Sequence, residues 1–190
     1  PAVNSSYIGN IIDVVVVKGN DINADVTWES LDAPYFLTGM TRVYGLNGLP
    51  ATLGLSPGVE MYMDDYAEIE FGYTGTSIYW GPGGLDSMGT PSMPVVITGG
   101  AVYDPGIWTG LDFNWCEDEQ VSLTYTEVGY GKNNLAFTGS SGDCHAIDKS
   151  VILDTIELHD ASQYGLRGVD DISGFGPITF YDNLGGDYAL

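Results

Sequence analysis

The stretch VSLTYT at residues 121–126 alternates apolar and polar side chains, with Val121, Leu123 and Tyr125 on one side and a serine and two threonines on the other. A period of two is that of a β-strand with one buried face. The stretch AEIEF at residues 67–71 has the same pattern. Antiparallel sheets commonly keep one face in water, so we expect both segments to be half-buried antiparallel strands.

Glycine and proline interrupt the chain at short intervals. There are 27 glycines and 9 prolines, clustered at residues 19–21, 45–50, 56–58, 81–84, 104–106 and 129–134. This spacing is typical of short strands joined by turns. Only residues 150–165 could hold a helix, and their β-branched side chains make a strand equally compatible with the sequence.

The strand spacing, the lack of alternating strands and helices, and the lack of a repeat of fixed period together favour one fold class. We predict an all-β protein with little helix: a two-sheet antiparallel sandwich of the single jelly-roll type. No linker-like tract divides the chain, so residues 1–190 are expected to form one domain, with residues 1–10 as an N-terminal arm.

The charge is strongly acidic: 26 Asp and Glu against 5 Lys and Arg give a formal net charge of -21. A chain with so few cations cannot release phosphate counterions, which excludes direct nucleic-acid binding. Hydrophobic residues make up 44% of the chain, so a folded domain with an acidic surface is expected. Its self-repulsion is screened in concentrated salt, as in proteins of halophiles, although an acidic secreted protein has the same composition.

Near the N-terminus, residues 11–17 (IIDVVVV) are apolar except for Asp13. The run has the length of a strand and is too short to span a membrane. An exposed edge strand of this kind is an aggregation hazard, so we expect it to be central in its sheet or covered by a neighbouring subunit. The candidate assembly residues are Ile11, Ile12, Val14, Val15, Val16 and Val17.

Cys116 and Cys144 are the only two cysteines. As a disulfide they would close a loop of about 28 residues and stabilise the fold by about 3–4 kcal/mol. Reduced, buried thiols are the alternative, which a cytoplasmic origin favours. A zinc site that adds His145 and His159 has poor spacing, because adjacent residues of a strand point to opposite faces.

Several clusters of carboxylates are candidate ion ligands, but none has the spacing of a calcium-binding loop. We therefore expect a solvated acidic surface, without a metal or a cofactor. The residues of the two main clusters are Asp64, Asp65, Glu117, Asp118 and Glu119.

Glu68 and Glu70 lie on one face of a predicted strand, and a retaining glycosidase of small jelly-roll type would need such a pair. That pair must face across a cleft at about 5–5.5 Å, so we interpret these two glutamates as an exposed strand face. The sequence has no G-x-S-x-G motif and no phosphate-binding loop. We expect no enzymatic activity and no soluble small-molecule substrate.

The stretch IIDVVVVKGN (residues 11–20), the turn spacing and the acidic composition resemble the small major capsid proteins of tailless, membrane-containing icosahedral viruses of halophilic archaea. The resemblance implies a single jelly roll, self-association or pairing with a second capsid protein, and a membrane layer beneath the shell. It also implies a virion protein assembled in the host cytoplasm. Pro1 agrees with synthesis without a signal peptide, since such peptides are rarely cut before proline.

The alternative is a secreted or surface β-sandwich that binds carbohydrate or mediates adhesion, which would be extracellular. Exposed tryptophans would then serve as a stacking platform, with Trp28, Trp80 and Trp108 as candidates.

Overall fold

The computed structural model describes residues 6, 8, 9, 13–72, 81–100, 106–114, 121–138, 151–169 and 172–189. Within them the chain forms seventeen strands, β1 to β17, and no α-helix, which confirms the strand-rich expectation. No helix capable of spanning a membrane occurs in these ranges.

The strands are arranged differently from the sandwich that we predicted. All ladders between named strands are parallel, in one sheet of ten strands and another of seven. In the first three turns of the chain each strand pairs with the strand three further on, as β1 does with β4, β2 with β5 and β3 with β6. The chain thus circles and returns in the same direction, so the antiparallel jelly roll is wrong and the fold is a parallel β-helix.

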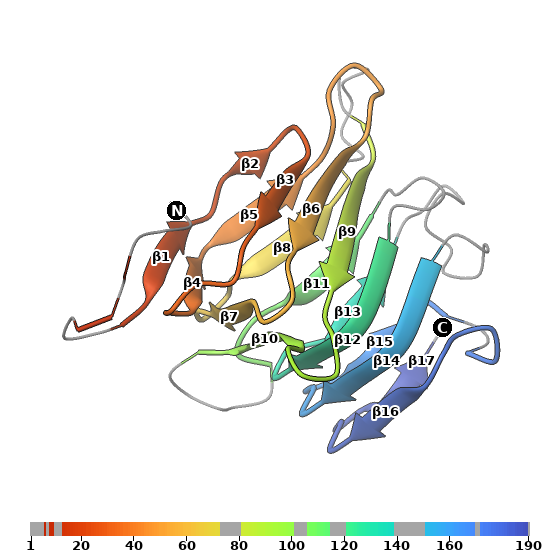
Figure 1. Cartoon of the computed structure of the whole chain (residues 1–190). Helices are drawn as coiled ribbons and strands as arrows, with labels where there is room; N and C mark the ends of the chain where they lie inside the picture. The colour runs from red at the N-terminus through yellow and green to blue at the C-terminus, as the bar shows by residue number, and fades with distance from the viewer. Residues whose placement is uncertain are drawn as a thin grey trace.

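The β-helix has three strand faces around its axis, and within each face the strands lie side by side along the axis (Figure 1). The first face holds β1 (Val15–Lys18), β4 (Tyr35–Thr38), β7 (Glu60–Met63), β10 (Val95–Gly99) and β16 (Ile178–Tyr181). The second holds β2 (Asp21–Ile22), β5 (Met40–Val43), β8 (Glu68–Phe71), β11 (Gly110–Phe113), β13 (Leu135–Phe137), β15 (Tyr164–Arg167) and β17 (Gly186–Ala189). The third holds β3 (Val26–Trp28), β6 (Ala51–Leu55) and β9 (Gly83–Met88).

Two long strands, β12 (Val121–Gly129) and β14 (Val151–His159), bend across the corner between the third face and the first. The first half of β12 pairs with β9 and its second half with β10. The bend falls at Tyr125, with φ of 43°, and in the next coil at Thr155, with φ of 55°. Bulky and β-branched residues rarely adopt this left-handed conformation. The alternation predicted for residues 121–126 therefore stops at Tyr125, which forms a corner.

Apolar side chains of all three faces fill the lumen. Ala67, Ile69 and Phe71 are at most 1% exposed, which confirms the inward face predicted for residues 67–71. Phe71, Phe113 and Phe137 stack in successive coils, with ring centroids 4.6 and 4.8 Å apart. The core is thus a set of side-chain rows that run along the axis, one residue from each coil.

Two asparagines, one buried and one partly buried, satisfy the backbone where the chain turns between faces. Asn134 donates from Nδ2 to the carbonyl oxygen of His159 at 2.8 Å and accepts from the backbone N–H of Gly131 at 2.9 Å. Asn183 bonds in the same way to Leu158 and Ala161. Unpaired buried backbone groups are costly, so these amides hold neighbouring coils together at the corners.

Candidate functional site

The first coil, formed by β1, β2 and β3, is one end of the β-helix. Among the described residues these strands pair only with β4, β5 and β6 of the second coil. Their other edges therefore carry backbone N–H and C=O groups that no described strand pairs. Such an edge is a template for another strand.

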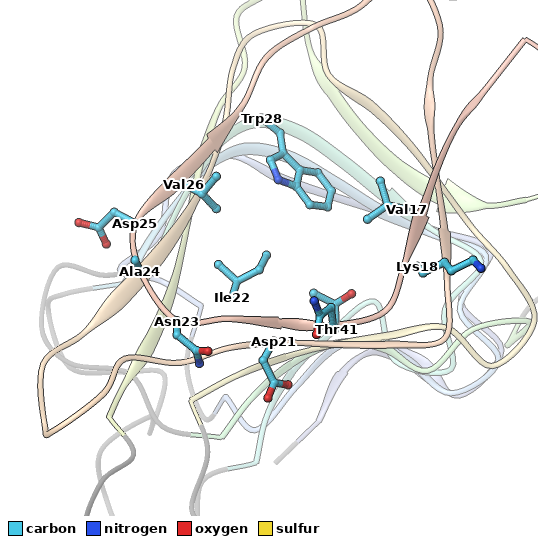
Figure 2. A pocket seen from close by; sticks show the side chains of 11 residues that line it. Val17, Lys18, Asp21, Ile22, Asn23, Ala24, Asp25, Val26, Trp28 and Thr41 are labelled. Carbon is cyan, nitrogen blue, oxygen red and sulfur yellow. The ribbon is translucent and has the colours of Figure 1, made fainter. Parts of the chain in front are cut away.

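The lumen opens at this end in a cavity of about 330 Å³. Val17, Ile22, Val26 and Trp28 point into it from the three strands, while Asp21 and Asp25 point away (Figure 2). The indole of Trp28 stacks on Tyr35 of the second coil, with centroids 5.1 Å apart. The mouth of the β-helix is therefore lined mainly by apolar side chains.

Thr41 on β5 is one of the residues that line the same cavity. The residue is 2% exposed, and within the described part of the chain its Oγ1 has no hydrogen-bond partner. It pairs in register with Ile69, a core residue, which places it at the inner end of the mouth. A buried hydroxyl without a partner costs about 1–3 kcal/mol.

The predicted assembly run lies partly in this coil. Val15, Val16 and Val17 belong to β1, Val14 directly precedes it, and Ile11 and Ile12 lie outside the described residues. Among the described strands β1 is the last at its edge of the sheet, so these strands do not give it a central position, one of our two expectations. Val16 is 57% exposed. The other expectation, cover by a neighbouring subunit, stays a prediction.

The remaining predicted residues do not gather into a site. Cys116, Glu117, Asp118, Glu119, Cys144 and Trp80 lie outside the described ranges, as do Pro1 to Ser5, Tyr7 and Asn10 of the predicted arm. Asp64 and Asp65 are described, and no group of three potential metal ligands occurs in the described ranges. Trp108 is 1% exposed and donates to the carbonyl of Gly129 at 2.9 Å, so it offers no stacking platform.

Glu68 and Glu70 point outward from the second face, as predicted, but both are half-buried. Glu70 accepts from Arg42 Nε at 2.8 Å and from Asn114 Nδ2 at 2.9 Å. Burial raises the pKa of Glu68, and the charges of Asp112 and Glu70 raise it further. Because Arg42 and Asn114 occupy both oxygens of Glu70, these contacts hold three coils together on the outer surface.

His159 is the centre of a second polar cluster, at the far corner of the first face. Its Nδ1 lies 2.8 Å from Asp160 Oδ2 and its Nε2 lies 3.1 Å from Glu127 Oε1. The ring stacks on Tyr181 at 4.6 Å, nearly parallel. Burial lowers the pKa of His159, but the hydrogen bonds and charges of Glu127 and Asp160 outweigh it and raise the pKa. Burial, with the carboxylates of Glu127 and Glu157, raises the pKa of Tyr181 to about 12.

Because the pKa of His159 is raised in the folded state, its contribution to stability is fully present below the unfolded pKa of about 6.5. It is lost as the pH rises through the higher folded value. We therefore expect the melting temperature of wild type to exceed that of His159→Gln by more at pH 5.5 than at pH 9. Glu157→Gln is the control. It removes a nearby carboxylate but leaves the bonds of both ring nitrogens, to Asp160 and Glu127, in place. An equal difference at both pH values would show that folding does not raise the pKa of His159.

Family models, curated proteins and solved structures give no match to this chain. The function is therefore argued from the geometry of the first coil.

The sequence alone did not single out Thr41. A threonine between Met40 and Arg42 has no distinguishing local pattern, and its burial depends on the position of β5 directly beneath the first coil. In the sequence, His159 stands out only as a poorly spaced zinc ligand, because its two carboxylate partners come from a neighbouring residue and from the preceding coil.

Proposed function

We propose that this protein is a structural building block that self-associates by adding a second copy to the edge of its first coil. The observation that carries the proposal is the apolar edge strand β1 beside an open apolar lumen. A parallel β-helix lengthens by stacking coils, so the same pairing that joins β1 to β4 is available to a further strand outside β1.

The composition of this edge supports the proposal. Repeat proteins usually close their ends with terminal repeats that have a polar outer face. Sheet edges that stay monomeric are usually protected by charges, prolines or bulges. Residues 14–17 are four valines, and Lys18 at the end of β1 is its one charged residue. Within the residues that the structure describes, the β1 edge thus lacks the usual protection.

The net charge of -21 sets the condition under which copies can meet. At about 0.1 M salt like charges repel over roughly 10 Å, whereas at 1 M the screening length falls to about 3 Å. Association is therefore expected in molar salt. The observed fold is not the jelly roll that the resemblance to capsid proteins implied. We therefore propose self-association alone, without a shell, a second protein or a membrane.

Sedimentation velocity in 2 M NaCl tests the proposal. We expect the wild-type protein to form larger species as its concentration rises. Val17→Lys places a charge in the mouth, which water reaches in the monomer but not in an assembly, and should weaken association at least tenfold while the monomer stays folded by circular dichroism.

The matched control is Val96→Lys. It adds the same charge to the outer side of β10, a strand paired on both edges by β7 and β12. This variant should associate as wild type does. A wild-type protein that remains monomeric at millimolar concentration in 2 M NaCl would refute the proposed function.

A further inference from the structure

A second cavity lies on the outside of the β-helix, at the corner between the third face and the first, where β12 and β14 bend. It has a volume of about 210 Å³, and three successive coils line it. The connection between β9 and β10 contributes Pro91 and Pro94, β12 contributes Tyr125 and Glu127, and β14 contributes Thr155 and Glu157. The mouth and this cavity share no described lining residue, so the cavity is separate from the surface proposed for self-association.

Local backbone geometry fixes the shape of this cavity. A Cβ at Gly89 would overlap the carbonyl oxygen of Tyr125, so glycine lets the end of β9 approach the corner closely. The turn that follows is closed by two backbone hydrogen bonds between Thr90 and Met93, at 3.0 and 3.1 Å. Tyr125 has φ of 43°, and strained backbone of this kind persists only where the surrounding structure determines it. The cavity is therefore preformed in the folded chain.

The polar groups of the cavity are hydrogen-bond acceptors. Glu127 and Glu157 pair in register, so their side chains leave neighbouring strands about 4.8 Å apart. His159 Nε2 lies 3.1 Å from Oε1 of Glu127, which leaves the second oxygen of this carboxylate as an acceptor. Thr155 donates its hydroxyl hydrogen to Asp154 at 3.1 Å, so towards a ligand this hydroxyl accepts. A ligand that satisfies these groups must carry several donors.

The other lining groups are rings with apolar surface, those of Tyr125, Pro91 and Pro94. A ligand that uses both kinds of lining has an apolar face and donors around its edge. A pyranose sugar has this form, because C–H groups cover its faces and hydroxyls surround the ring. A simple cation would bind the carboxylates and leave the rings unused. Acidic sugars are disfavoured by the two carboxylates and by the net charge of -21.

We propose that this cavity binds one neutral hexose unit of a glycan, with a face of the sugar ring on Tyr125 and its hydroxyls donating to Glu127 and Glu157. Aromatic side chains suit such a ligand, since they combine a large apolar surface with a defined geometry. The stacking group is thus a tyrosine at a strained corner, and not one of the tryptophans considered from the sequence. The site is complete in one chain, so it does not depend on self-association.

Titration of the ¹⁵N-labelled protein in 0.15 M NaCl tests the ligand class. The probes are the methyl glycosides of glucose, galactose and mannose. At least one should shift the amide signals of residues 125–127 and 155–157, with an affinity that 1 M NaCl leaves unchanged, because the ligand is uncharged. Glucuronate should bind at least tenfold more weakly. No shift with any of the three glycosides would overturn the proposal. Shifts with arginine ethyl ester alone, lost in 1 M NaCl, would overturn it in favour of a cation site.

Single substitutions test the position of the site. Tyr125→Asn removes the ring and suits the left-handed backbone, so the variant should fold and bind the glycoside about tenfold more weakly. Tyr66→Asn is the matched control, because it makes the same change at a tyrosine with φ of 63° that is 87% exposed at another corner. Its affinity should equal that of wild type. Glu157→Gln should weaken binding about fivefold, through loss of a charged acceptor. Unchanged binding by Tyr125→Asn would refute this site.

Discussion

Gly110→Ala is expected to destabilise the protein by more than about 4 kcal/mol, a large fraction of the stability of a typical domain. Gly110 opens β11 with φ of 119°, a conformation that side chains rarely adopt. A Cβ at this position would overlap the carbonyl oxygen of Asn133, and carbonyl and backbone cannot rotate away as a side chain can. The substitution therefore combines a strained backbone with the separation of two neighbouring coils.

Gly174→Ala is the matched control for this prediction. It makes the same chemical change at a glycine whose φ is not positive, and nothing lies within 4 Å of the added Cβ. Its free energy of unfolding should remain within about 0.5 kcal/mol of wild type or rise slightly, since alanine restricts the unfolded chain. Urea denaturation followed by circular dichroism measures both variants. Equal stability of the two variants would mean that the coils that hold Gly110 and Asn133 can move apart without a loss of stability.

The inward and outward faces of individual strands could be predicted, because alternation is a local property. Ala67, Ile69 and Phe71 point inward and Glu68 and Glu70 outward, as the sequence indicates. Strand direction is not local. The same alternation fits an antiparallel strand with one solvent-exposed face and a β-helix strand with one face in the lumen. The pattern of residues 67–71 therefore favoured the commoner, antiparallel arrangement.

The repeat of the β-helix was hidden by unequal coils. Val15 and its partner Tyr35 are 20 positions apart, whereas Phe71 and its partner Phe113 are 42 apart. Insertions between strands change the coil length without disturbing the stack, because only the strands must remain in register. A search for a fixed period therefore fails on a chain whose repeat is spatial.

For the same reason, the sequence predicted one part of the candidate site, the apolar strand, and not the other. The apolar run at residues 14–17 marks β1 as a strand that needs cover, and the structure places it at an edge. The burial of Thr41 depends on the position of β5 directly beneath the first coil, and this follows from the pairing of the coils. No local pattern carries that information.

Phe113→Ala is the second large effect that we expect. Phe113 is fully buried, and its ring lies between those of Phe71 and Phe137, at 4.6 and 4.8 Å. Removing the ring leaves a cavity between the two remaining rings and should lower the free energy of unfolding by about 3–5 kcal/mol. The two stacked pairs contribute part of this loss, since each aromatic pair is worth about 0.5–1.5 kcal/mol beyond its buried area.

The position of Phe113 in the β-helix gives this prediction a second observable. Each coil contacts mainly the coils before and after it, so the stability of the whole approximates a sum of coil and interface terms. A weak interface in the middle lets the two halves unfold separately. We therefore expect Phe113→Ala to broaden or split the urea transition, with a lower m-value for each step than for wild type.

Phe180→Ala provides the comparison, since it removes the same side chain from the last coil, where the ring is only partly buried and lies tilted beside the ring of Tyr188 at 6.4 Å. It should cost less than Phe113→Ala and keep a single transition, because an end coil can loosen without dividing the remainder. The measurement is urea denaturation at fixed salt, monitored by circular dichroism. If Phe113→Ala lost no more stability than Phe180→Ala, the three-phenylalanine stack would not be the part of the core that holds the coils together.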